Sequence, residues 1–143
     1  MVGVERSFLT DVPFPVTLEA PVPQISVDYS PSLDGSFDRR ELGEAINRLA
    51  VETIAARPEG CKTVFRRTDP EVVVGYGERT DAQVFVQFRI FPGRSAEAKT
   101  ALTEGVLALL AAQLKPAPGE RLHLAVDVRD MDREVYRNTA IEG

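Results

Sequence analysis

The chain has 143 residues, 43% of them hydrophobic, which is enough apolar material for the core of one domain. Its 17 basic and 22 acidic residues give a net charge of -5, which argues against a general nucleic-acid binder. Because Cys61 is the single cysteine, an intrachain disulfide is excluded, and we expect a reducing, cytoplasmic setting. Glu5, Arg6 and Asp11 near the N-terminus argue against a secretory signal, and no apolar window approaches the length of a membrane span.

Residues 1–22 contain three prolines, spaced so that they exclude a helix and favour an extended N-terminal arm. Phe8 and Phe14 lie in this arm, and such aromatic side chains favour packing on a neighbouring surface, in the same chain or in another subunit. The alternative is an extension of the chain that has no role.

The next part of the chain predicts a strand, a helix and a second strand. Apolar and polar residues alternate over 24–29, the period of a half-buried strand. Asp38 is the predicted N-cap of an amphipathic helix over 39–56, which a proline and a glycine then end. Residues 61–66 predict the second strand.

A hairpin is predicted before a second unit of the same kind. Residues 72–76 and 83–91 are rich in β-branched and aromatic residues, and 77–81 between them have the composition of a hairpin connection. Ser95 then predicts the N-cap of a helix over 96–114. One more strand is indicated by the alternation over 122–128.

This order predicts an α+β fold. Two β-α-β units form a mainly four-stranded sheet with both helices on one face, together with an extra hairpin strand and the arm of residues 1–22. Residues 23–143 form the domain itself. Since two helices cover only one face, we expect the strand residues Phe65, Phe85 and Phe88 to favour self-association through the other.

Few residues are suited to catalysis by side chains alone. His123 is the only histidine and no serine lies in a nucleophile-elbow pattern, so a catalytic triad is unsupported and His123 is expected to be an ordinary surface or interface residue. Asp127, Asp130 and Asp132 lack the glycine and the glutamate of a calcium loop. No metal and no cofactor is expected.

Arg94 is the most informative charged residue. The run of residues 91–97 places it at a strand-to-helix turn, beside the free N–H groups of a helix start, where a guanidinium could bind a carboxylate. On spacing alone, an ordinary surface arginine is the simpler interpretation. Lys62, with Arg66 and Arg67 nearby, adds positive charge that could share a pocket with Arg94.

Three segments carry a family resemblance: residues 23–30, residues 85–97 with their Gly-Arg-Ser turn, and the tail through 136–138. Together they resemble the 5-carboxymethyl-2-hydroxymuconate isomerase family of the tautomerase superfamily, over essentially residues 23–143. The resemblance implies a homotrimer of paired β-α-β units whose catalytic base is an N-terminal proline. It also implies an isomerase that acts on a small unsaturated 2-hydroxy or 2-keto carboxylic acid.

The resemblance also suggests the site residues. It implies Pro23 as the counterpart of the catalytic base, and Arg94 as the arginine that binds a substrate carboxylate. Lys62 lies near the position of a second arginine of the family, and a lysine keeps the charge but loses the planar fork of two donors.

The nitrogen of Pro23 decides between two hypotheses about function. As the sequence stands this nitrogen is an amide, so Pro23 has no basic amine and would only begin an edge strand. In the first hypothesis, translation starts at position 22, where an initiator methionine is inserted in place of Val22. Removal of this methionine makes the nitrogen of Pro23 a secondary amine. In the alternative, the long form binds a carboxylate ligand, uses another base, or is a non-catalytic oligomeric protein.

Overall fold

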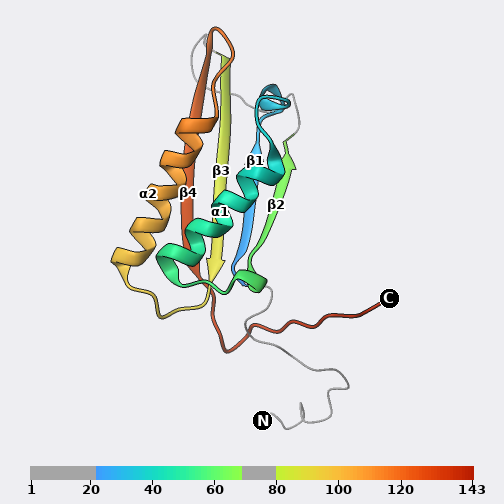
Figure 1. Cartoon of the computed structure of the whole chain (residues 1–143), viewed down its shortest axis with the longest axis vertical. Coiled ribbons are helices and arrows are strands. Elements are labelled where there is room, and N and C mark those ends of the chain that lie inside the picture. The colour runs from blue at the N-terminus through green and yellow to red at the C-terminus, as the bar shows by residue number, and fades with distance from the viewer. Residues whose placement is uncertain (1–21, 69–79) are drawn as a thin grey trace.

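The computed structural model describes residues 22–68 and 80–143, which form one mixed sheet covered on one face by two helices (Figure 1). The sheet has four strands, in the order β2-β1-β3-β4. Along the chain the elements are β1 (Gln24–Tyr29), the 3-10 helix η1 (Pro31–Leu33), α1 (Arg39–Ile54), the 3-10 helix η2 (Pro58–Gly60), β2 (Lys62–Arg67), β3 (Thr80–Ile90), α2 (Ala96–Gln113) and β4 (Glu120–Asp130).

Two β-α-β units make up the sheet, as the sequence predicts. β1 pairs in parallel with β2, β3 pairs in parallel with β4, and the two units join through the antiparallel pair β1–β3. β1 is therefore an inner strand, so the expectation that Pro23 begins an edge strand is wrong. Pro23 is tolerated because it precedes the first paired residue, Gln24.

Both helices start at the predicted caps. The side chain of Asp38 accepts a hydrogen bond from the backbone N–H of Glu41 at 2.9 Å, and Ser95 accepts one from Ala98 at 3.1 Å. α1 ends at Ile54, two residues earlier than predicted, because Ala55 adopts the left-handed conformation with φ 54°. The proline and glycine that follow belong instead to η2.

The predicted hairpin is only partly described. β3 begins at Thr80, so residues 80 and 81, which the sequence places in the turn, pair with Glu120 and Arg121 of β4. The predicted strand over 72–76 lies outside the described residues, and so does the arm except for Val22.

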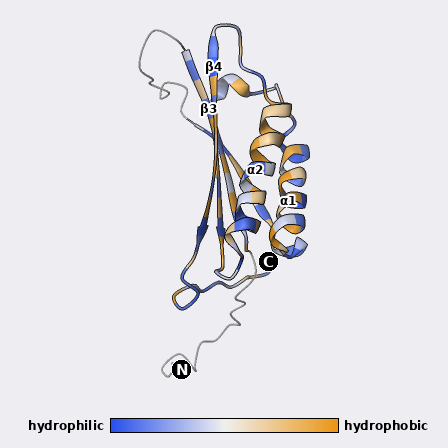
Figure 2. Cartoon of the chain, turned by 90° about the vertical axis from the view of Figure 1, so that its left-hand side faces the viewer, coloured by the Kyte–Doolittle hydropathy of each residue, from blue (hydrophilic) through white to orange (hydrophobic). Residues whose placement is uncertain are grey.

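The core lies between the sheet and the two helices, which Figure 2 shows on the same side of the strands. Alternate residues of β1 and β3 point into it, and apolar residues of α1 and α2 meet them. The core includes Ile25, Val27, Tyr29, Leu42, Ile46, Ala50, Val84, Val86, Phe88, Leu102, Val106 and Leu110.

The opposite face of the sheet, which we call the open face, carries mostly polar side chains. Phe88 is 1% exposed inside the core, and Phe65 packs on the helix side against the rings of Tyr29 and Phe37. Of the three phenylalanines expected on the open face, only Phe85 has the parity to lie there. The described part of the sheet therefore has no phenylalanine-rich surface for self-association.

Within the described ranges, none of the helices is long and apolar enough to cross a membrane. After β4, residues 131–143 leave the sheet as an extended segment (Figure 1). Val135 and Ile141 in this segment are 76% and 89% exposed.

Candidate active site at one end of the sheet

The three predicted site residues lie at the same end of the sheet. Pro23 directly precedes β1, Lys62 begins β2, and Arg94 follows the end of β3. The antiparallel pairing of β1 with β3 sets Gln24 opposite Arg89, so the start of one strand meets the end of the other. The backbone N–H of Lys62 donates to the carbonyl oxygen of Pro23 at 3.3 Å, which ties the first two residues together.

Pro23 is buried, and so is Val22 before it, with 7% of its surface exposed. The bond between them makes the nitrogen of Pro23 an amide, whose lone pair is delocalised into the carbonyl group. In this form the nitrogen can neither accept nor donate a proton at neutral pH.

The backbone of Arg94 lies at the predicted strand-to-helix turn, but its side chain turns away from the start of α2. Its Nε donates to the carbonyl oxygen of Ile54 at 2.9 Å, and one terminal nitrogen donates to that of Phe91 at 3.3 Å. Ile54 is the last residue of α1, so the guanidinium caps the end of that helix, where a positive charge also complements the helix dipole. These bonds use two of the five N–H groups that a guanidinium offers.

Gly93 makes the turn before Arg94 possible. Its φ is 125°, a conformation that residues with a Cβ rarely adopt. The chain can therefore leave β3 and reach the N-cap Ser95 within a few residues, with Arg94 facing α1.

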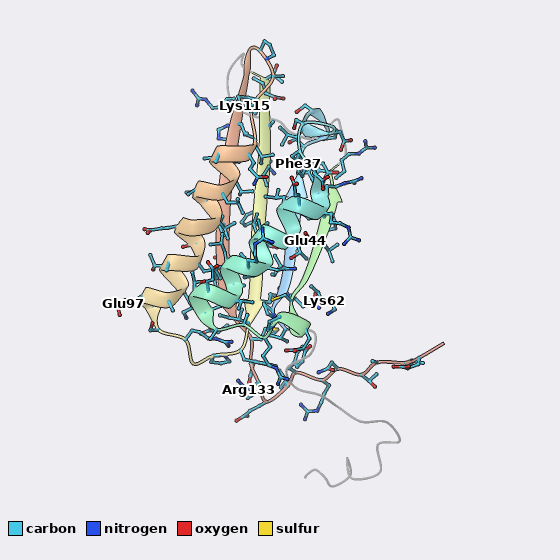
Figure 3. The ribbon with its side chains drawn as sticks, viewed as in Figure 1. Phe37, Glu44, Lys62, Glu97, Lys115 and Arg133 are labelled. Atoms are coloured by element: carbon cyan, nitrogen blue, oxygen red, sulfur yellow. The ribbon has the colours of Figure 1, made fainter. Side chains whose placement is uncertain are left out.

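Lys62 is exposed at the lower end of β2, and its ammonium group donates to the carbonyl oxygen of Glu59 at 3.0 Å (Figure 3). That partner is a neutral backbone group, so no carboxylate among the described residues pairs with Lys62. Arg66 forms an ion pair with Asp28 at 2.9 Å, and Arg67 forms one with Asp34 of the loop after η1. Both pairs lie farther along β2, so these two arginines do not share a pocket with Arg94.

An aromatic cluster at this end was not predicted. Phe91 is 2% exposed, the ring of Tyr136 meets it edge to face with centroids 5.1 Å apart, and the guanidinium of Arg133 lies 4.2 Å from its centroid. Figure 3 shows Arg133 and Lys62 toward the same end. Both arginines thus contact Phe91: Arg133 lies over its ring, and Arg94 donates a hydrogen bond to its carbonyl oxygen. The path of the chain after β4 follows no periodicity, so no sequence signal points to Arg133.

Other reactive groups are placed for structure. Burial raises the pKa of the Cys61 thiol, which disfavours the thiolate form. His123 is exposed toward the opposite end of the sheet, with Nε2 3.0 Å from a carboxylate oxygen of Asp81, which confirms its surface position. Residues 22–68 and 80–143 contain no group of three or more His, Cys, Asp or Glu side chains able to hold a metal ion.

Comparison with known proteins identifies the relatives of this chain. A family model described as 5-carboxymethyl-2-hydroxymuconate isomerase matches residues 23–142. No curated protein matches the sequence.

Among solved structures, a 5-carboxymethyl-2-hydroxymuconate isomerase from Deinococcus radiodurans R1 is similar, with a TM-score of 0.58 and 18% identity, covering 85% of this chain and 92% of that one. A fused 4-OT symmetric trimer has a TM-score of 0.62 and 21% identity, covering 76% and 85%. FG41 malonate semialdehyde decarboxylase has a TM-score of 0.58 and 18% identity, covering 76% and 83%. These similarities establish the tautomerase fold.

Proposed function

Because the chain belongs to the 5-carboxymethyl-2-hydroxymuconate isomerase family, we propose that it isomerises a small unsaturated 2-hydroxy or 2-keto carboxylic acid. Family membership supports an isomerase of the tautomerase type. One observation carries the more specific proposal: the family match begins at Pro23, directly before the first residue of β1. The part of the chain that resembles the family therefore starts with a residue that could serve as a base.

The proposed base is the nitrogen of Pro23 in a chain that begins at this residue. Such a chain arises if translation starts at position 22 and the initiator methionine is removed, or if the chain is cleaved between Val22 and Pro23. The nitrogen is then a secondary amine, and an exposed α-amine titrates at about 8. The cationic groups Lys62 and Arg94 at the same end favour the unprotonated amine. This amine removes a proton from one atom of the substrate and returns it to another carbon, so the reaction consumes neither an oxidant nor a cofactor.

Arg94 and Lys62 are the proposed carboxylate-binding residues. Arg94 retains N–H groups beyond the two that bind Ile54 and Phe91, so it can hold a carboxylate while it caps α1. Lys62 is exposed beside Pro23, and no carboxylate of residues 22–68 and 80–143 pairs with it. Both cations would stabilise the negative charge of the dienolate that forms during the proton transfer.

We also propose that the protein is a homotrimer. The related fused 4-OT structure is described as a symmetric trimer. In the described part of the sheet, β2 and β4 are the edge strands. Val64 on β2 is 47% exposed, and Val135 and Ile141 of the C-terminal segment are exposed as well. Unpaired strand edges and exposed apolar residues favour assembly. Light scattering coupled to gel filtration measures the mass directly, and a monomer would refute the trimer.

A second candidate function is a carboxylate-binding protein without turnover by Pro23. The observation that favours it is the burial of Val22 together with the amide bond to Pro23. In this form Lys62 and Arg94 keep their charges, so binding does not require the amine. The arm of residues 1–22 would then cover or reshape the site.

The decisive experiment compares three proteins: the full chain, the chain that begins at Pro23, and the latter with Pro23→Ala. Ketonisation of 2-hydroxymuconate, followed by ultraviolet absorbance, reports turnover. We expect catalysis from the chain that begins at Pro23, a loss of about 100-fold or more with Pro23→Ala, and only the background rate from the full chain.

Equal rates for the full chain and the chain that begins at Pro23 would exclude the proline amine as base. The intact mass of the protein from its native host decides which form exists in the cell. A mass that includes residues 1–21 supports the second candidate function.

A further inference from the structure

We propose that the open face of the sheet holds a second anion-binding site, which takes a small dianion and is organised by Arg89. The structure has a hollow of about 310 Å³ on this face, formed by β1, β2 and β3. It is lined by Gln24, Ile25, Ser26, Val64, Arg66, Gln87 and Arg89. This site goes beyond the proposed function, because none of Pro23, Lys62 and Arg94 lines the hollow.

The register of the strands brings these residues together. Arg89 of β3 lies opposite Gln24 of β1, and Gln87 lies opposite Ser26. The neighbours of Arg89 in β3, Phe88 and Ile90, are buried in the core, so strand alternation directs Arg89 to the open face. Ser26 and Gln87 thus add a hydroxyl and an amide group to the lining, and both can donate hydrogen bonds to an oxyanion.

The charges around the hollow favour an anion. The side chain of Arg89 is exposed, and within residues 22–68 and 80–143 it makes no hydrogen bond or ion pair. Gln24 of β1 lies between Arg89 of β3 and Lys62 of β2. Within the same described ranges, the ammonium group of Lys62 binds only a backbone carbonyl oxygen. These two cations are not neutralised by the described residues, although the whole chain has a net charge of -5. A free guanidinium fork binds carboxylate or phosphate oxygens in a bidentate manner.

Apart from Lys62 and Arg89, the charged residues of the strands beside the hollow are paired, and the exposed Arg121 lies at the other end of β4. Arg66 binds Asp28 at 2.9 Å, and Arg129 of β4 binds Asp127 at 2.7 Å. The two carboxylates are therefore compensated by their own arginines. The excess of positive charge beside the hollow belongs to Arg89, and Lys62 of the proposed active site adds to it. The described residues therefore place a net positive charge beside the hollow.

The size and lining of the hollow restrict the ligand. Ligand pockets range over roughly 300 to 1,000 Å³, so this one suits a small molecule. Val64 and Ile25 are its only apolar residues among those described, which gives a lipid chain or an aromatic ring little surface to bury. Two kinds of ligand match the size and the charge of the hollow: a short dicarboxylate and inorganic phosphate. Both carry two negative charges on compact oxygen groups.

Titration calorimetry on the full-length protein, in the assembly that it forms in solution, tests the site with succinate, inorganic phosphate and the monocarboxylate propionate. We expect saturable binding of a dianion, weaker binding of propionate, and a loss of about tenfold with Arg89→Gln. The binding of succinate without phosphate would identify a dicarboxylate site, and the reverse a phosphate site.

Two matched variants distinguish loss of this site from a general loss of positive charge and from damage to the proposed active site. Arg121→Gln removes an exposed arginine from the far end of the open face, so it should bind the dianion as the parent does. Arg94→Gln alters the proposed carboxylate-binding site, so the loss caused by Arg89→Gln should have the same size in the Arg94→Gln background. The thermal midpoint of Arg89→Gln should equal that of the parent.

Three results would overturn the proposal: undiminished binding by Arg89→Gln, no saturable binding of either dianion, or an equal loss with Arg121→Gln. Because calorimetry needs no turnover, a failure here is distinct from a failure of the isomerase proposal.

Discussion

Replacement of Arg94 by alanine is expected to destabilise the end of α1, whatever the substrate. The guanidinium makes hydrogen bonds to the carbonyl oxygens of Ile54 and Phe91, at 2.9 and 3.3 Å. A hydrogen bond that involves a charged group contributes about 1.5 to 3 kcal/mol, and a cation at a helix C-terminus about 0.3 to 1 kcal/mol. Because Arg94 is partly exposed, water replaces some of this, and we expect a net loss of about 2 kcal/mol.

Urea unfolding followed by circular dichroism, at several fixed protein concentrations, measures this loss as a lower midpoint with an unchanged slope. For a chain of this length, the thermal midpoint should fall by about 6 °C. Arg94→Lys keeps the charge but loses the fork, so it should recover about half of the stability.

Arg121→Ala is the matched control, because Arg121 is exposed and makes no side-chain hydrogen bond or ion pair within the described ranges. Its effect should stay within about 0.5 kcal/mol. If Arg94→Ala changes stability no more than this control, the capping role assigned to Arg94 is wrong.

Two further predictions concern ionisable groups. The hydrogen bond from Arg67 holds the pKa of Asp34 below its ordinary value. The pair therefore stabilises the fold fully at a pH above the ordinary pKa of an aspartate, and this contribution is lost as the pH falls through the lowered pKa. The difference in urea midpoint between the parent and Arg67→Gln should therefore narrow from about pH 5 to about pH 3, and a constant difference would contradict this. Burial raises the pKa of the Cys61 thiol, so iodoacetamide should alkylate the folded protein much more slowly than the urea-unfolded protein at the same pH, and equal rates would contradict the burial.

The sequence predicted the helices and strands of the described fold because their signals are local. Asp38 and Ser95 cap their own helices, and the alternation over 24–29 appears as β1. The end of α1 was missed because Ala55 adopts a left-handed conformation that glycine usually supplies. No local signal distinguishes an alanine that does so.

The faces of the strands were harder to assign than their positions. Phe85 and Phe88 lie three residues apart in β3, so strand alternation sends them to opposite faces. The expectation of a phenylalanine-rich open face ignored this parity. Phe65 faces the helices because Gly43 of α1 leaves room for its ring, and a Cβ on that glycine would lie 3.1 Å from the ring. Such a match between two elements is set by packing and cannot be inferred from one segment.

The candidate site combines both kinds of information. The family-like segments predicted Pro23, Lys62 and Arg94, and their common location follows from the topology, which brings the starts of β1 and β2 to the end of β3. The direction of the Arg94 side chain could not be predicted from the sequence, because it depends on the carbonyl groups left without helical partners where α1 ends. Loss of activity on replacement of Arg94 is therefore ambiguous unless stability is measured in the same samples.

The functional question then depends on a single peptide bond. Removing the bond between Val22 and Pro23 turns a planar amide nitrogen into a basic amine, while Lys62 and Arg94 are held by β2 and by α1 and do not need that bond. The full chain and the chain that begins at Pro23 should thus bind carboxylates with similar affinity and differ in turnover. A large difference in affinity instead would mean that residues before Pro23 occupy the site, which favours the role of a binding protein with a covered pocket.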